Sequence, residues 1–117
     1  MTIEVIDNFL KREEFNILKE NILPIPSKNY FPWYFQQDKV FPGDKGKQFT
    51  HIFYQNFKIN SEHFDTILPV LNKLNIYALR KVKINLTLPE KNFGKYGFHR
   101  DFDDPHKVAK TGIFYFN

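Results

Sequence analysis

Apolar residues recur at helical spacing in two parts of the chain. One part runs from Lys11 to Leu23 and the other from Ser61 to Leu74. Their apolar faces would consist of Phe15, Leu18 and Ile22 in the first, and of Phe64, Ile67, Leu68, Leu71 and Leu74 in the second. Pro69 should kink or divide the second helix, because its ring removes an amide donor and clashes with the preceding turn. The pattern therefore predicts two amphipathic helices.

Alternating apolar and polar residues predict β-strands in the rest of the chain, since successive side chains of a strand point to opposite faces. The predicted strands are Ile3–Ile6, Tyr30–Phe35, Phe49–Phe57, Leu79–Leu88 and Thr111–Asn117. The Leu79–Leu88 strand is the clearest, with an apolar face of Val82, Ile84, Leu86 and Leu88 and a polar face of Lys81, Lys83, Asn85 and Thr87. Two helices followed by antiparallel strands predict an α+β fold, in which N-terminal helices back one face of an antiparallel sheet. We expect a pocket on the polar side of that sheet.

The composition limits the functions to be considered. The 117 residues are 42% hydrophobic and include 14 Phe, which is enough apolar material for one packed core. The absence of cysteine excludes disulfides and thiolate metal sites. No segment reaches the roughly 20 consecutive apolar residues of a membrane span, and the N-terminus does not have the pattern of a signal peptide. We therefore expect a cytoplasmic protein without a membrane partner. The net charge of +4 is dispersed and gives nucleic-acid binding little support.

His99 and Asp101 form the most informative pair of side chains. Two residues apart on a strand, they would point the same way. An imidazole and a carboxylate can supply two legs of the 2-His-1-carboxylate triad that holds non-haem Fe(II). The spacing alone favours a solvated pair at a strand end, beside the polar loop that contains Asp103 and His106, and only the surrounding sequence favours metal ligation. His106 is a weaker candidate for the third ligand, because a solvated loop residue explains it more simply.

The residues around this pair carry a family likeness. Tyr96 precedes His99-Arg100-Asp101, and a Thr-x-x-x-Tyr-x-Asn sequence follows at Thr111–Asn117. From Val82 onward the chain resembles the first half of a 2-oxoglutarate/Fe(II)-dependent dioxygenase of the prolyl 4-hydroxylase-like branch, and it is particularly similar to small bacteriophage-encoded members. The similarity extends to the N-terminal Asp7-Asn8-Phe9-Leu10, to Phe31-Pro32-Trp33-Tyr34 and to the Ser61–Leu74 helix.

The resemblance implies a double-stranded β-helix, or jelly roll, that holds iron and 2-oxoglutarate between its two sheets. His99 and Asp101 match the first two iron ligands of the family. Tyr115 matches the tyrosine that reaches the distal carboxylate of 2-oxoglutarate, and Thr111 shares its strand face. Tyr96 and Asn85 would line the cosubstrate pocket. The implied activity couples decarboxylation of 2-oxoglutarate by O2 to hydroxylation of a substrate that the sequence does not identify.

The family's second iron-binding His, and the basic residue that pairs with 2-oxoglutarate, lie beyond the point where this chain ends. We therefore expect one partial domain, with a supporting region at residues 1–77 and the first jelly-roll strands at residues 78–117, that is inactive by itself. An alternative is a non-catalytic chain whose open strand edge pairs with a second chain. A small basic nucleic-acid-binding module is a third and weaker hypothesis.

The two remaining histidines have simpler explanations. His51 lies among aromatic residues on one face of the Phe49–Phe57 strand, which is typical of a core histidine whose nitrogens are hydrogen-bonded. His63 falls in the first turn of the second predicted helix, where we expect it to be exposed. Tyr115 has an alternative of its own as a half-buried strand aromatic.

Overall fold

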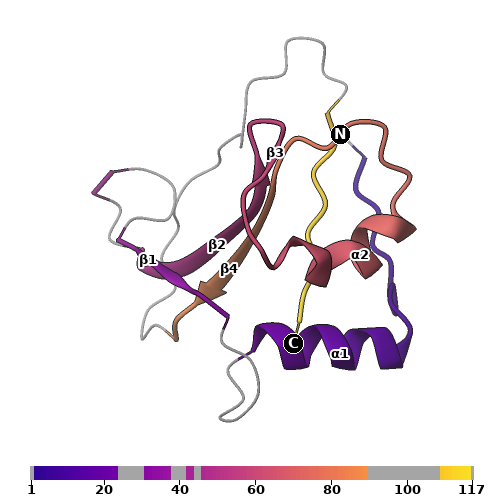
Figure 1. Cartoon of the computed structure of the whole chain (residues 1–117), viewed down its shortest axis with the longest axis horizontal. Helices are drawn as coiled ribbons and strands as arrows, with labels where there is room; N and C mark the ends of the chain where they lie inside the picture. The colour runs from indigo at the N-terminus through magenta and orange to yellow at the C-terminus, as the bar shows by residue number, and fades with distance from the viewer. Residues whose placement is uncertain (1, 24–30, 38–41, 44–45, 90–108, 117) are drawn as a thin grey trace.

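The computed structural model describes residues 2–23, 31–37, 42–43, 46–89 and 109–116. Helices and strands follow one another in the order α1 (Arg12–Ile22), β1 (Tyr34–Gln36), β2 (Gln48–Gln55), β3 (Lys58–Ile59), the 3-10 helix η1 (Phe64–Ile67), α2 (Leu68–Lys73) and β4 (Val82–Thr87). The strands lie together on one side of the molecule and the helices on the other (Figure 1). The predicted α+β class, with two α-helices and an antiparallel sheet, is confirmed.

β2 is the central strand of the sheet and pairs antiparallel with each of the other three strands. Thr50 pairs with Tyr34 of β1 on one edge and with Asn85 of β4 on the other. Tyr54 pairs in the same way with β3 and β4. β1 and β3 therefore follow one another along one edge of β2, and β4 runs along the opposite edge.

The hydrophobic core lies between the helices and one face of the sheet. Its buried members come from every layer of the structure: Leu10, Leu18, Ile22, Phe31, Phe53 and Ile67. Val82 and Ile84 of β4 pack against this cluster, as predicted, whereas Leu88, the last residue of the predicted apolar face, lies beyond β4 and is 40% exposed. Burying a side chain of this size contributes about 1.5–3 kcal/mol, so these contacts are what hold α1 against the sheet. The opposite face of β4, which carries Asn85 and Thr87, points away from the helices.

Pro69 divides the second helical segment as predicted. The chain forms η1 up to Ile67 and then α2 from Leu68, with the proline in the first turn of α2. An amide donor is not needed at that position, because the first N–H groups of a helix have no partner within the helix. The sequence therefore folds into two short helices in place of one long helix.

A bulge interrupts the pairing of β2 with β4. Ile52 pairs with Lys83, but the next pair joins Tyr54 to Val82, so Phe53 has no opposite residue. A bulge of this kind changes the direction of the side chains that follow it. Phe53 is fully buried against Phe31, and the ring of Tyr54 also reaches the helices, 6.0 Å from that of Phe64.

All five predicted strands differ from the structure, and Phe49–Phe57 does so because β2 ends at Gln55 and Asn56-Phe57 form the turn before β3. Ile3–Ile6 forms no strand, and Ile3 and Val5 are exposed. The described part of the predicted Thr111–Asn117 strand, residues 111–116, also belongs to no helix or strand. Alternation predicts an extended chain, but a strand also needs a partner with free backbone groups. β1 and β4 are shorter than their predicted strands, and β1 begins only after Pro32, which has no N–H for a ladder.

The segment 109–116 is held by aromatic side chains. The ring of Phe114 lies 6.3 Å from that of Phe9 and 6.2 Å from that of Phe15, while Phe116 stacks on Phe15 at 6.4 Å. Figure 1 shows this segment ending beside α1. Side chains near both ends of the described chain therefore meet on the first turns of α1.

Candidate functional site

Three of the predicted site residues, Tyr96, His99 and Asp101, lie outside the described residues, and so does His106. Within the described ranges there is no group of three His, Cys, Asp or Glu side chains that could hold a metal ion. The iron ligands therefore remain a prediction from the sequence.

Asn85 lies on the sheet face that points away from the helices. It pairs with Thr50, and Thr87 pairs with Gln48, so the four side chains share this face. Gln48 and Thr50 are buried although they are polar, whereas Asn85 is exposed. The prediction that the polar face of the β4 segment lies opposite the helices is confirmed, and it gives that face a row of hydrogen-bonding groups.

Thr111 and Tyr115 lie on the segment that packs against α1. Phe114 and Phe116 point towards the core, whereas Ile113 and Tyr115 are 73% and 71% exposed. Thr111 is exposed as well, and so are its neighbours Lys110 and Gly112, so its place on the face of Tyr115 stays a prediction. The inward side of this segment contacts the helical layer, whereas Asn85 points away from that layer. The described contacts therefore do not bring Tyr115 and Asn85 together.

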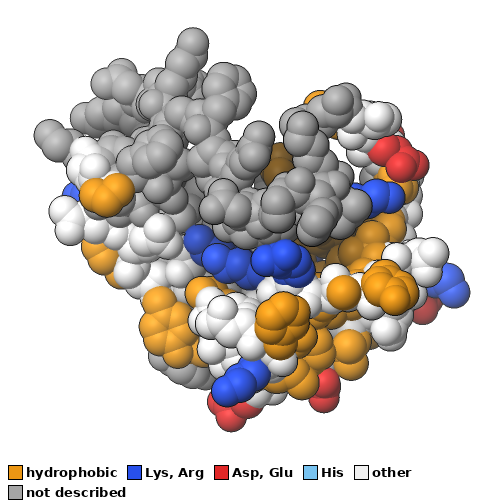
Figure 2. Space-filling model, turned by 90° about the horizontal axis from the view of Figure 1, so that it is seen from above, with side chains coloured by type: hydrophobic (Ala, Val, Ile, Leu, Met, Phe, Trp, Pro, Cys, Tyr) orange, Lys and Arg blue, Asp and Glu red, His pale blue; other side chains and the backbone are white. Residues whose placement is uncertain are grey.

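On the face seen in Figure 2, Lys and Arg side chains gather beside exposed apolar side chains.

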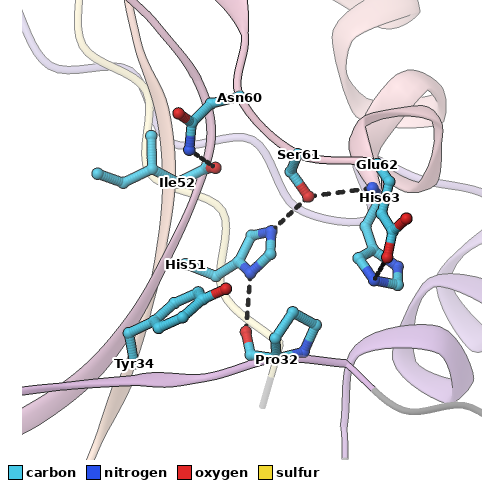
Figure 3. A pocket seen from close by; sticks show the side chains of 8 residues that line it. All are labelled: Pro32, Tyr34, His51, Ile52, Asn60, Ser61, Glu62 and His63. Carbon is cyan, nitrogen blue, oxygen red and sulfur yellow. Dashed lines mark hydrogen bonds and ion pairs between the residues drawn. The ribbon is translucent and has the colours of Figure 1, made fainter.

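A pocket of about 340 Å³ lies where the loop after β3 meets β2 and the segment before β1. Residues 60–63 line one side, and Pro32, Tyr34, His51 and Ile52 line the other (Figure 3). Asn60 fixes the backbone of this loop with two hydrogen bonds. Its side-chain Nδ2 donates to the carbonyl oxygen of Ile52 at 2.9 Å, and its backbone N–H donates to the carbonyl oxygen of Phe53 at 2.8 Å.

His51 is buried at the inner end of this pocket, with 3% of its surface exposed. Its Nδ1 lies 2.7 Å from the carbonyl oxygen of Pro32, and its Nε2 lies 2.7 Å from Oγ of Ser61. A carbonyl can only accept, so Nδ1–H donates to Pro32. In a neutral imidazole Nε2 then accepts from the Ser61 hydroxyl, while Ser61 Oγ itself accepts from the N–H of His63 at 3.0 Å. The predicted core histidine with both nitrogens hydrogen-bonded is confirmed.

The environment of His51 keeps its ring neutral. Burial lowers the pKa of His51 below its ordinary value, the hydrogen bond to Pro32 raises it, and the neighbouring His63 lowers it again. The net effect is a lowered pKa, because the buried ring loses the hydration that a charged imidazolium needs. At neutral pH the ring therefore holds one proton, on Nδ1, and presents a lone pair to Ser61.

His63 is only partly exposed, so the prediction of an exposed histidine was wrong. Its ring meets the edge of Phe31 at 5.3 Å and lies 6.0 Å from the ring of His51. The helix begins later than predicted: Ser61 holds a turn, and η1 starts at Phe64. That turn directs His63 towards the core in place of the solvent.

Comparisons of the chain with protein-family models, curated proteins and solved structures find no match.

The pairing of Ser61 with His51 was not predicted from the sequence. The two residues lie ten positions apart and meet because the β2–β3 hairpin folds the chain back on itself. Ser61 was only the first residue of the second predicted helix, and no local motif links it to His51. Of the helices that the described residues form, none is long and apolar enough to cross a membrane.

Proposed function

We propose that this protein is an Fe(II)/2-oxoglutarate-dependent dioxygenase of the prolyl 4-hydroxylase-like branch, and that its sheet is part of a jelly roll. The motif in the sequence supports the proposal, because Tyr96, His99-Arg100-Asp101, Thr111 and Tyr115 match the family in order and spacing. The observation that carries it is the polar sheet face of β2 and β4. A jelly roll encloses its ligands between two sheets, and a sheet that faces such a site needs hydrogen-bonding side chains.

The polar face meets that requirement on the side opposite the helices. Asn85 and Thr50 form a cross-strand pair there, flanked by Gln48 and Thr87. Gln48 and Thr50 are buried on this face, and buried polar side chains are normally hydrogen-bonded. These residues are suited to contact a polar ligand or a polar second layer.

The donor set of the motif fits Fe(II). A neutral imidazole and a carboxylate are two of the three ligands in the facial triad, which leaves positions open for other groups. With 2-oxoglutarate and O2, the iron would supply the oxidative decarboxylation that drives hydroxylation. Tyr115 would donate its hydroxyl to the distal carboxylate of 2-oxoglutarate in a charge-assisted hydrogen bond. We assign Asn85 no contact with the same molecule, because the described contacts do not bring Asn85 and Tyr115 together. No residue of this sequence matches the third ligand.

Anaerobic titration of the full chain with Fe(II) and 2-oxoglutarate tests the proposal. We expect a weak visible charge-transfer band that appears only when both are present. His99→Ala and Asp101→Ala should each abolish the band and weaken iron binding, because each removes one of the ligands. His63→Ala, which changes a histidine outside the motif, should keep both.

The alternative hypothesis gives a different result. A non-catalytic chain that pairs through a strand edge would show no band, and its iron affinity would be the same with and without His99. In folded protein, the absence of the band would contradict the proposed dioxygenase function, and so would an iron affinity that is unchanged in His99→Ala.

A further inference from the structure

We propose that Ser61 is a nucleophile, activated by His51, that takes an acyl group from small neutral esters. The inference is independent of the iron chemistry proposed above. It rests on three features of the described pocket: the hydrogen bond between the two side chains, the fixed orientation of His51, and the space beside Ser61.

The hydrogen bond has the geometry of a nucleophile and its general base. Oγ of Ser61 lies 2.7 Å from Nε2 of His51, within the range of about 2.6–3.2 Å found for such pairs. A serine hydroxyl is a weak nucleophile unless a neighbouring base removes its proton as it attacks. His51 presents the lone pair that this step requires, because its single proton is on the other nitrogen.

A third group fixes the base in that state. In serine hydrolases a carboxylate holds the Nδ1–H of the histidine and thereby sets its tautomer and orientation. Here the carbonyl oxygen of Pro32 holds Nδ1–H at 2.7 Å. The carbonyl sets the tautomer without bringing a charge into a buried site. The ring of Phe31, whose centroid lies 4.4 Å from that of His51, packs against the imidazole.

The space beside Ser61 admits a small molecule. The side chain is partly exposed and lines the pocket of about 340 Å³, a volume at the lower end of small-molecule sites, which run from about 300 to 1,000 Å³. Figure 3 shows the Ser61 hydroxyl between His51 and the backbone of His63. No Lys or Arg lines the described pocket, and Glu62 is its single carboxylate. This lining favours a neutral ester over an anionic substrate.

The proposed reaction is acyl transfer in two balanced steps. Oγ of Ser61 forms a bond to the ester carbonyl carbon while its proton passes to Nε2 of His51. The bond from that carbon to the leaving alcohol breaks, and the alcohol takes the proton from Nε2. Water then attacks the acylated Ser61 in the same way, which releases the acid and restores the hydroxyl.

The test uses p-nitrophenyl acetate with the full chain. We expect p-nitrophenolate release together with an acetyl group on Ser61, located by mass spectrometry of peptides. The chain has only two serines, so Ser27→Ala is a matched control for Ser61→Ala. Ser27→Ala should leave the protein-dependent rate unchanged. Ser61→Ala should lower it about a hundredfold, the lower end of what a positioned general base contributes.

Lysine side chains also react slowly with this ester, but they do so in all three proteins, so the difference between the two serine variants isolates Ser61. A variant of the buried His51 could unfold, and the serine variants avoid that problem because each removes a single oxygen atom. Circular dichroism confirms that they are folded. Equal rates in the two variants, or acetyl groups found only on lysines, would show that Ser61 is no more than a turn residue and overturn the proposal.

Discussion

Among single residues, His51 ties the stability of the fold to pH. Its pKa is lowered in the folded state, chiefly by burial, from an ordinary value of 6.5. As the pH falls below that value, the unfolded chain binds a proton that the folded chain still excludes. The stability contributed by a neutral His51 is therefore complete above the unfolded pKa, and it is lost as the pH falls through the folded pKa. We expect the free energy of unfolding, measured with urea at a series of pH values, to decrease from pH 7 towards pH 5.

One variant separates His51 from the other titrating groups. His51→Gln cannot take up the proton, so its unfolding free energy should depend less on pH across this range, even if the variant is less stable at every pH. If His51→Gln showed the same slope as the unaltered protein, the burial of a neutral His51 would not be the source of the pH dependence.

The sequence predicted what His51 is but not what it binds. A histidine between Phe49 and Phe53 on an alternating strand is indicated as a core residue by that pattern alone. Its partners, Pro32 and Ser61, come from segments on either side of β2 in the sequence. Only the folded sheet and hairpin bring those segments to the ring, so no local pattern could have named them.

Among the secondary-structure elements, the β2–β3 hairpin contains a strained turn. Its two-residue loop, Asn56-Phe57, has φ angles of 52° and 60°, as a type I′ turn requires. Asn tolerates this conformation, but a residue with a bulky side chain loses about 1–2 kcal/mol in it. Phe57 regains little of this by packing, because it is 77% exposed.

Phe57→Gly should therefore stabilise the protein. The relief of strain exceeds the extra chain entropy of glycine, about 0.5–1 kcal/mol, so we expect a net gain of roughly 0.5–1 kcal/mol in urea unfolding. Phe57→Ala is the matched control, since it removes the ring but keeps the Cβ that causes the strain. A gain of equal size in both variants would assign the effect to the exposed ring and contradict the turn as its origin.

Periodicity located the helices and the central strands but not their irregularities. The apolar spacing placed α1 within one residue of its ends, and Pro69 marked the division between η1 and α2. The bulge at Phe53 has no signal in the alternating pattern, because it depends on the register between β2 and β4. It is also what lets Tyr54 reach the helical layer together with Phe53.

For the molecule as a whole, the pattern of apolar positions predicted that the helices cover one side of the sheet. It did not predict that the described parts of the two terminal segments stay outside the sheet. Apolar faces on two helices and on β4 can be buried together only if the helices cover one side of the sheet. Ile3–Ile6 and Thr111–Asn117 alternate as strands do, yet alternation says nothing of a partner, and the described parts of both segments lie outside the sheet. The iron half-site stays a prediction, because His99 and Asp101 fall outside the described residues.

The contacts of Phe114 make the segment 109–116 part of the fold, and this can be measured. Phe114 lies against Phe9 and Phe15, whereas the adjacent Ile113 is 73% exposed. Complete burial makes a Phe→Ala change cost about 3–5 kcal/mol, so for the half-buried Phe114 we expect Phe114→Ala to lower the unfolding free energy by about 2 kcal/mol. Ile113→Ala, on the outward side of the same segment, should change it by no more than about 0.5 kcal/mol. Equal effects in the two variants would mean that the segment does not dock on α1 in solution, and Tyr115 would then have no fixed position from which to bind 2-oxoglutarate.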